Sequence, residues 1–253
     1  MSFFDSAYKG GPPPWDIGRP QKEFVELVRR GEIIGSVLDI GCGTGEHALF
    51  FAAEGHEVWA IDSAPLAIEK AKEKAAERGL RVHFLVMDAL HMSELIRKFD
   101  TGRGAAGQVP DQKKTAKEFS TGRETVEQVS DQERTAKQFS TGRESTGQVP
   151  DQEKTAKQFS TATDSGLFHT LSDEDRPAFV DALAAVLSPG GKYFMLCFSD
   201  LEPAGYGPRR ITQGEIRESF RVGWTINYIR PATFESRTRA EGPRAWLSSI
   251  SRK

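Results

Sequence analysis

Apolar runs alternate with amphipathic stretches along the first ninety residues. Runs that are apolar throughout are typical of parallel strands buried on both faces, and apolar positions three and four residues apart are typical of helices. The predicted strands are 37–40, 57–62 and 81–90, and the predicted helices are 20–31, 47–54 and 65–78. Gly55 and Gly79 follow two of these helices, where glycine commonly ends a helix. The alternation predicts an α/β fold with a parallel sheet.

The pattern resumes after residue 164 and ends in two consecutive strands. A helix is expected after the acidic residues 172–175, because carboxylates are favourable at a helix N-terminus. The remaining predicted elements are short helices at 92–98 and 215–220 and strands at 193–198, 224–229 and 245–250. The last two strands are expected to form an antiparallel hairpin. Residues 1–19 and 199–211 contain several glycines and prolines and are predicted to be loops.

Three tandem copies of a 20-residue unit, at 102–121, 122–141 and 142–161, separate the two halves. Each copy has few apolar residues to bury, so we predict a polar insertion with short helices or disorder. Joining residue 101 to residue 162 restores a fourth strand, which predicts one domain formed by 1–101 and 162–253. A phenylalanine begins the same short segment in every copy. The copy that runs directly into Asp164 is expected to supply this strand, at 159–163.

A glycine turn follows the first predicted strand, with glycines at 41, 43 and 45. Glycine permits a tight turn and lets the backbone approach a ligand, and the next helix directs free N–H groups to the same place. A dinucleotide-binding turn would carry its third glycine at position 46. Glu46 stands there instead, and its carboxylate would repel a pyrophosphate but tolerate a cationic ligand.

The pattern hydrophobic-hydrophobic-Asp-hydrophobic-Gly-x-Gly-x-Gly resembles the cofactor motif of class I S-adenosylmethionine (SAM) methyltransferases. The Pro-Pro-Trp-Asp-x-Gly-Arg-Pro arm at 13–20 resembles that of small-molecule methyltransferases of the thiopurine, tellurite-resistance and quinone types, especially an actinobacterial branch. The resemblance implies a Rossmann-like, doubly wound sheet of seven strands in the order 3-2-1-4-5-7-6, with the last strand antiparallel. It also implies methyl transfer from SAM to O, N or S of a small molecule.

The resemblance further implies which residues hold the cofactor. Gly41, Cys42 and Gly43 would approach the methionine part through their backbone, and Asp62 would bind the ribose. Asp62 could instead cap the helix that follows, although Ser63 can take that role. The implied contacts are Trp15, Arg19, Asp39, Gly41, Cys42, Gly43, Gly45, His47, Asp62, Ser63, Met87, Asp88 and Ala89.

Three of these assignments have competing interpretations. Trp15 could form a lid over the cofactor or fill the edge of the core. Arg19 is available for a carboxylate group of a ligand. Asp88 would meet the adenine amino group, between Met87 and Ala89, or could simply be a turn residue.

Two titratable residues fall where the resemblance places the transferred methyl group. Asp164 ends the fourth predicted strand, and His169 follows five residues later. Methyl transfer depends on alignment and needs a base only if the acceptor must lose a proton. His169 could be that base, or it could be a packing residue. Asp164 could orient the acceptor or shape the site around the amino-acid end of the cofactor.

Composition narrows the remaining possibilities. The net charge is −2 and the pI is about 6.3, so there is no global basic field for nucleic acid. Two cysteines, Cys42 and Cys197, fit a reducing cytoplasm better than a disulfide or metal site. No signal peptide or membrane span is evident. Two rival functions remain: a SAM-binding scaffold with reduced or no activity whose repeats bind a protein, and a nicotinamide-linked oxidoreductase. The oligomeric state and the acceptor stay open.

Overall fold

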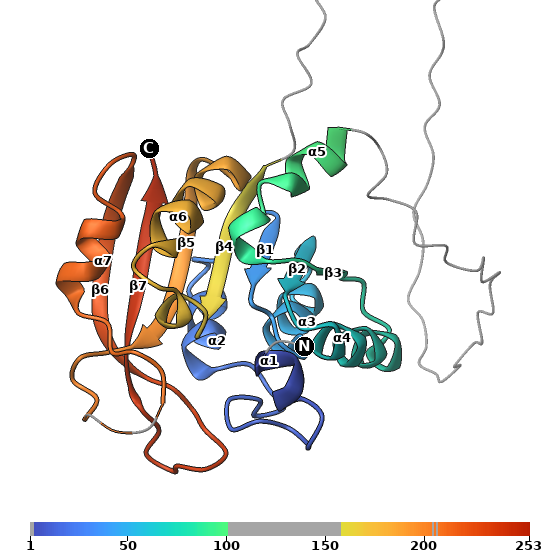
Figure 1. Ribbon diagram of the computed structural model, residues 1–253. Helices are drawn as coiled ribbons and strands as arrows, with labels where there is room; N and C mark the ends of the chain where they lie inside the picture. Colours follow the sequence, from blue (N-terminus) through green and yellow to red (C-terminus); the bar gives the residue numbers. More distant parts are fainter. Residues whose placement is uncertain (1–2, 101–157, 204, 206) are drawn as a thin grey trace, which may run out of the picture. The chain divides into compact units, whose positions relative to one another are not determined.

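The computed structural model describes residues 3–100, 158–203, 205 and 207–253, which belong to one compact unit. Its centre is a seven-stranded sheet in the order β3-β2-β1-β4-β5-β7-β6 (Figure 1). The strands are β1 (Val37–Ile40), β2 (Val58–Asp62), β3 (His83–Val86), β4 (Phe159–Ser165), β5 (Leu187–Phe198), β6 (Trp224–Thr233) and β7 (Arg244–Arg252). The pairs among the first five strands are parallel, whereas β7 is antiparallel to both of its neighbours. The predicted strand order and the antiparallel last strand are confirmed.

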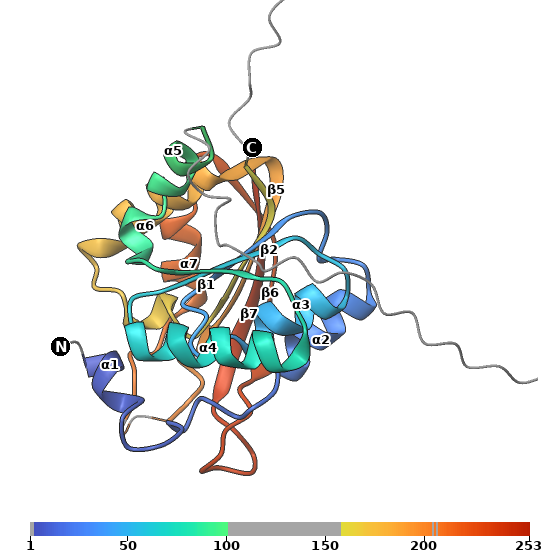
Figure 2. The same ribbon diagram turned by 90° about the vertical axis from the view of Figure 1, so that its right-hand side faces the viewer.

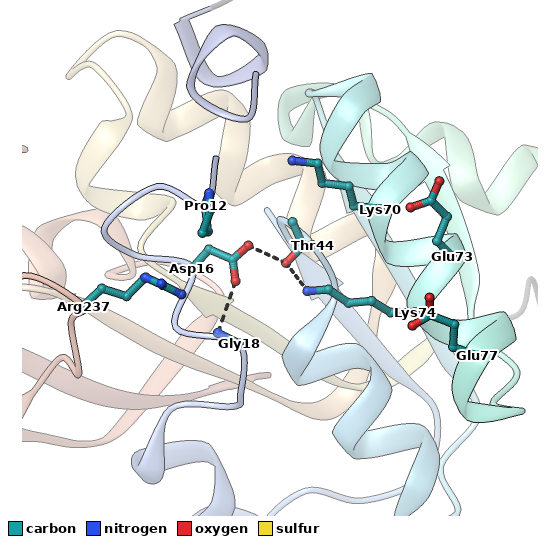
Figure 3. Close-up of a pocket in the computed structure, with 9 residues that line it drawn as sticks. All are labelled: Pro12, Asp16, Gly18, Thr44, Lys70, Glu73, Lys74, Glu77 and Arg237. Carbon is teal, nitrogen blue, oxygen red and sulfur yellow. Dashed lines mark hydrogen bonds between the residues drawn. The ribbon is translucent and has the colours of Figure 1, made fainter. Parts of the chain in front are cut away.

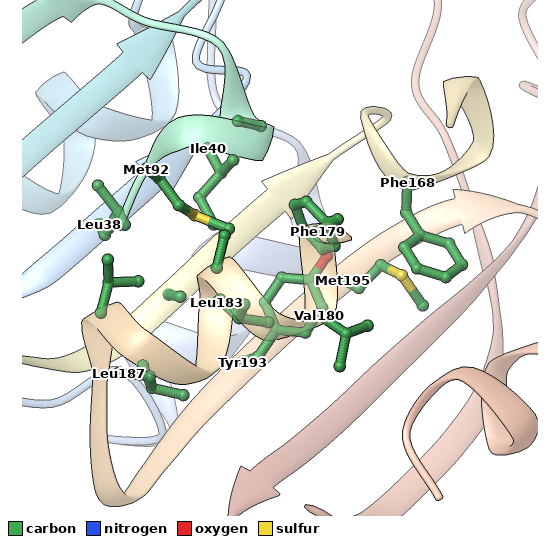
Figure 4. Packing of buried hydrophobic residues seen from close by; sticks show 14 of the residues in the cluster. Leu38, Ile40, Met92, Phe168, Phe179, Val180, Leu183, Leu187, Tyr193 and Met195 are labelled. Carbon is green, nitrogen blue, oxygen red and sulfur yellow. The ribbon is translucent and has the colours of Figure 1, made fainter. Parts of the chain in front are cut away.

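Helices cover both faces of the sheet (Figure 2). One face carries α2 (Lys22–Arg29), α3 (Glu46–Ala53) and α4 (Pro65–Arg78), and the other carries α5 (Glu94–Asp100), α6 (Asp175–Val186) and α7 (Gln213–Ser219). Two short 3-10 helices are η1 (Ala89–His91) and η2 (Phe168–Thr170). Figure 4 shows the core under α6, where Phe179 and Leu183 pack against Tyr193 of β5. All three side chains are fully buried.

The fourth strand begins at Phe159, as expected for the last repeat copy. Its centre holds Ala162 and Thr163, where a larger aliphatic pair would be usual for a parallel strand. The buried threonine hydroxyls are satisfied: Thr161 donates to Ile34 O at 2.8 Å, and Thr163 donates to Asp39 Oδ1 at 2.9 Å. The strand therefore keeps polar residues in the core by pairing each of them.

The amino-terminal arm differs from the prediction of a loop over 1–19. Residues Phe3–Ala7 form a short helix, α1. Leu66 N, in the first turn of α4, donates to Asp5 Oδ1 at 3.2 Å, and Tyr8 packs on Ala64 and Ala67 of the same region. The wrong prediction has a physical reason, since this helix depends on contacts with residues sixty positions away.

The three repeat copies at 102–161 lie outside the described residues, except for 158–161. In the part that is described, no helix is both long enough and apolar enough to cross a membrane. The same residues contain no cluster of histidine, cysteine or carboxylate side chains suited to hold a metal ion.

Candidate functional site

The glycine turn lies between β1 and α3, at the carboxyl end of the parallel strands, where doubly wound sheets bind ligands. Gly41, Gly43 and Gly45 have φ values of 68°, 54° and 83°, which favour glycine. The positions that a Cβ atom would take at these glycines point in different directions. A Cβ on Gly43 would lie 2.9 Å from Tyr8 Oη, and one on Gly41 would lie 3.0 Å from the Leu167 side chain.

Gly45 has a different role from the other two glycines. A Cβ there would come within 3.0 Å of Ala71 on α4 and of the Phe84 ring on β3. Its missing side chain therefore serves the packing of α3 against α4 and β3.

Asp62 ends β2 and reaches across to the glycine turn. Gly43 N donates to its Oδ2 and Ala64 N to its Oδ1, both at 2.8 Å. Burial raises the pKa of Asp62, against these two hydrogen bonds. Ser63 is exposed and makes no cap hydrogen bond to α4. The expectation that Ser63 frees Asp62 from the start of α4 is therefore wrong, because Asp62 itself binds Ala64 N.

Asp39 lies under the turn and is only 2% exposed. Its Oδ1 accepts the Thr163 hydroxyl, while its Oδ2 is buried with no hydrogen-bond partner. Burial raises the pKa of Asp39 to about 7, and the nearby charges of Asp164 and Asp62 raise it further, whereas the Thr163 hydroxyl and the backbone N–H of Ala48 lower it. An unpartnered buried oxygen among several carboxylates suits a cationic ligand.

The arm places two aromatic residues near the turn. Trp15 is 46% exposed and donates from Nε1 to Tyr8 Oη at 3.1 Å. Tyr8 is the buried member, with its hydroxyl over Gly43. Sequence reasoning missed Tyr8 because only the fold of the arm brings it there. Trp15 and Tyr8 therefore form a pair at the glycine turn, with Tyr8 the more buried of the two, and the lid over the cofactor stays a prediction.

The other predicted arm residue, Arg19, pairs with Glu235 of the β6–β7 loop (residues 234–243) at 2.8 Å. Glu235 also accepts from Lys22 N through its side chain, and its backbone pairs twice with the Gln21 side chain. Arg19 therefore ties the arm to this loop and does not point to the glycine turn. It was predicted as a carboxylate partner, and the carboxylate it binds belongs to the protein.

The predicted adenine residues follow β3. Met87 and Ala89 are buried, whereas Asp88 is exposed and accepts Leu90 N at 2.9 Å through one oxygen. That hydrogen bond caps the start of η1. One oxygen of Asp88 therefore has the role of a turn residue, which was the alternative interpretation. Its second oxygen makes no hydrogen bond with the described residues.

The side chains of Cys42 and His47, in and just after the glycine turn, are packed within the protein. His47 Nε2 accepts Gln21 N at 3.0 Å, and burial lowers the pKa of its imidazole to about 4. Cys42 is buried, which raises the pKa of its thiol. The His47 side chain is thus paired within the protein, and the backbone of Cys42 belongs to the glycine turn.

Glu46 pairs with Lys74 at 2.7 Å and with Arg78 at 2.9 Å. Burial would raise the pKa of Glu46, yet the hydrogen bonds from Arg78 and Lys74 lower it. Because these two cations compensate its charge, Glu46 does not repel a pyrophosphate as we expected. The charge of Glu46 therefore does not exclude a nicotinamide cofactor.

A pocket of about 390 Å³ lies between the arm and α4 (Figure 3). Thr44 is at its centre, donating to Asp16 at 2.8 Å and accepting from Lys74 at 2.7 Å. Its other lining residues are Pro12, Gly18, Lys70, Glu73, Glu77 and Arg237. None of the predicted cofactor residues lines this pocket.

Asp164, at the end of β4, is fully buried. Its carboxylate accepts Leu167 N at 2.6 Å, Phe168 N at 2.9 Å and the Tyr193 hydroxyl at 2.9 Å. Burial raises its pKa to about 6 despite these hydrogen bonds. The carboxylate of Asp164 thus stabilises the turn that leads into η2. In this turn, the Leu167 side chain packs against Gly41.

His169 lies in η2 and is 7% exposed. Phe198 N donates to its Nδ1 at 3.0 Å, and its ring packs against Phe198 and Phe234. Burial lowers the pKa of His169 to about 3, and the positive charge of Arg210 contributes. A group with such a pKa is a weak proton acceptor at neutral pH.

Known proteins resemble this chain over most of its length. A family described as a methyltransferase domain matches residues 37–121. The 2-heptyl-1-hydroxyquinolin-4(1H)-one methyltransferase of Mycobacteroides abscessus is 30% identical over an alignment 242 residues long, and the match covers 92% of this chain and 80% of that protein.

Solved structures agree with this relationship. One, determined in work on the conversion of a disulfide bond into a thioacetal group during echinomycin biosynthesis, has a TM-score of 0.68 at 28% identity and covers 99% of this chain and 91% of that one. The N-methyltransferase NodS of Bradyrhizobium japonicum, solved with S-adenosyl-L-homocysteine, has a TM-score of 0.60 at 14% identity, which shows the fold alone; the match covers 98% and 96%.

These relatives decide between the interpretations left open by the sequence. The relatives above that are named for an activity are methyltransferases, and none supports an inactive scaffold or a nicotinamide-linked oxidoreductase. The glycine turn, the Asp62 carboxylate beside it and the unpartnered oxygen of Asp39 suit S-adenosylmethionine. The chain therefore belongs to the class I S-adenosylmethionine-dependent methyltransferases that act on small molecules.

Proposed function

We propose that this protein methylates an acidic hydroxyl group on a small heteroaromatic acceptor. The Mycobacteroides abscessus relative is named for a quinolone that carries a hydroxyl on its ring nitrogen. The observation that carries the proposal is the meeting of two segments: Leu167, from the turn that also holds His169, packs on Gly41 of the glycine turn. The segment expected to contact the acceptor therefore lies directly beside the turn expected to contact the cofactor.

Within this function the cofactor is held by groups that sequence and geometry both favour. Gly41 and Gly43 allow close backbone approach, Asp62 accepts from ribose hydroxyls, and Asp39 faces the cationic amino-acid part. Asp88, between Met87 and Ala89, meets the adenine. The bound cofactor supplies a methyl group on a sulfonium. The protein's part is to align the acceptor and exclude water.

Two further features complete the proposal. The catalytic domain is formed by 1–101 and 162–253, with the repeats at 102–161 as an insertion. The protein acts in the cytoplasm, where the free thiols of Cys42 and Cys197 remain reduced.

A direct assay tests the acceptor class. The protein is incubated with SAM and 2-heptyl-1-hydroxyquinolin-4(1H)-one, and the product is analysed by mass spectrometry. We expect one added methyl group on this compound and none on the analogue that lacks the hydroxyl on nitrogen. Equal methylation of both compounds, or methylation of neither beside normal SAM binding, would contradict the proposed acceptor.

The unusual state of Asp39 predicts a pH-dependent cofactor affinity. With a pKa near 7, the carboxyl of the free protein is protonated at pH 6 and ionised at pH 8. A cationic ligand prefers the ionised form, so SAM should bind more tightly as the pH rises through 7, by roughly tenfold.

Calorimetric titration between pH 5.5 and 7.0 measures this effect, over a range in which the ligand's own amino group stays mostly protonated. The Asp39→Asn variant is the reference, because it keeps the shape of the side chain and cannot ionise. Its affinity should vary little over this range. An equally steep slope in both proteins would assign the dependence to another group.

A further inference from the structure

The side chain of His169 has one ring nitrogen occupied and one free. Phe198 N–H donates to Nδ1 at 3.0 Å, so Nδ1 must be the acceptor in this pair. Turning the ring over would place a carbon opposite Phe198 N–H and leave a buried donor unpaired. In a neutral imidazole whose Nδ1 accepts, the proton is on Nε2.

Nε2–H makes no hydrogen bond with the described residues, and the residue as a whole is 7% exposed. It faces Gly166, whose φ is +96°; a Cβ there would lie 3.7 Å from Nε2. The missing side chain of Gly166 leaves room beside this donor. The rings of Phe198 and Phe234 flank the same place.

The groups around His169 all disfavour a positive charge on it. Phe198 of β5 and Phe234 of the β6–β7 loop are apolar, and the nearby charged side chain that acts on the ring is Arg210, of the loop after β5. Arg210 stacks on Phe198 with 5.5 Å between its Cζ and the ring centroid. Its Nε is buried and has no hydrogen-bond partner in the described part of the chain. The carboxylate of Asp164 lies on the same segment as His169 and already accepts three hydrogen bonds.

From this arrangement we infer that His169 is a hydrogen-bond donor to an acceptor that binds already deprotonated, and that it does not act as a base. Arg210 adds a positive charge that favours the anion. This inference rests on the proposed methylation of an acidic hydroxyl and narrows it to substrates ionised near neutral pH.

The transfer balances without a proton acceptor in the protein. The proton of the hydroxyl leaves to solvent before binding. The oxygen anion then supplies the electron pair for the new oxygen–methyl bond. The pair of the breaking sulfur–methyl bond stays on sulfur, which becomes a neutral thioether. Nε2–H holds the oxygen in line and keeps its own proton throughout.

A series of ring-substituted 1-hydroxyquinolin-4(1H)-ones with different hydroxyl pKa values tests the inference on the wild-type protein. We expect kcat/KM to rise with pH at a midpoint that follows the pKa of each acceptor. A midpoint that is the same for all acceptors would belong to a group of the protein and would overturn the inference.

Two variants separate donation from proton transfer. His169→Gln keeps an N–H donor of similar reach, whereas His169→Phe keeps a ring and loses the donor. We expect His169→Phe to lose on the order of 100-fold in kcat/KM, and His169→Gln to retain most of the activity with an unchanged pH midpoint. Equal losses in both variants would overturn the inference. Thermal unfolding of each variant shows whether a loss reflects folding.

The tautomer can be observed without turnover. In 15N-histidine spectra, the signal that disappears in His169→Gln should show a neutral ring protonated at Nε2 from pH 5 to 8. A ring protonated at Nδ1, or one that titrates in this range, would overturn the inference even if every acceptor were methylated. Failure of all acceptors beside the expected spectrum would instead overturn the proposed function.

Discussion

Replacing Gly43 with alanine is expected to weaken SAM binding by ~100-fold or more, equivalent to about 2.7 kcal/mol. Gly43 has a φ of 54°, and its free face lies against the Tyr8 hydroxyl, 2.9 Å from the position of a Cβ. The methyl group would collide with the Tyr8 hydroxyl, which lies over the glycine turn. It would also displace the arm that covers the turn.

Gly79→Ala is the matched control. Gly79 has a φ of 63°, so alanine suffers a similar backbone strain of roughly 1–2 kcal/mol, but nothing lies within 4 Å of its Cβ position. Calorimetric titration with SAM and thermal unfolding should show similar losses of stability and a loss of affinity in Gly43→Ala alone. Comparable affinities for the two variants would mean that the turn does not contact the cofactor.

The second large effect is expected from Asp62→Asn. The two oxygens of Asp62 each accept a backbone N–H, from Gly43 and from Ala64. An asparagine can accept only one, and its amide would point a donor at the other donor. We expect a loss of about 1–3 kcal/mol in the free energy of unfolding and a 10- to 100-fold loss in SAM affinity, because the ribose loses an acceptor as well.

Glu215→Gln provides the comparison for Asp62→Asn. Glu215 also accepts a backbone N–H, from Thr212 in the capping box of α7, on the sheet face opposite to α4. Denaturant unfolding should show a loss of stability in both variants. Cofactor affinity should fall only in Asp62→Asn. If Glu215→Gln also lost affinity, the effect of Asp62 would reflect general stability.

Local patterns were sufficient to predict the α/β class and the positions of most elements, whereas the order of the strands followed from the resemblance to the methyltransferase family. Strand and helix positions follow from apolar runs and from glycines such as Gly79, which ends α4 with a left-handed φ. The start of β4 at Phe159 was predictable because only the last repeat leads into Asp164. The α1 helix was not, because Asp5 and Tyr8 are fixed by α4, far along the chain.

The site was predictable in position and less so in the role of each side chain. A motif shows which residues gather, but not which atoms are already occupied. Arg19 binds Glu235, Glu46 binds Lys74 and Arg78, and Asp164 binds three donors. Each of these partners comes from a distant element or from a later turn. The charges of these side chains alone therefore suggested interactions with a ligand, whereas each of the side chains is paired within the protein.

The start of β4 has a consequence for how the gene for this chain can vary. Every repeat ends in Phe-Ser-Thr, and it is this tripeptide, at 159–161, that opens the strand beside β1. Slippage during replication adds or removes tandem units as wholes. Any whole number of units would still deliver the same three residues to the amino end of the strand, opposite to the catalytic edge. A change in copy number by whole units would therefore leave the sequence of β4 unchanged.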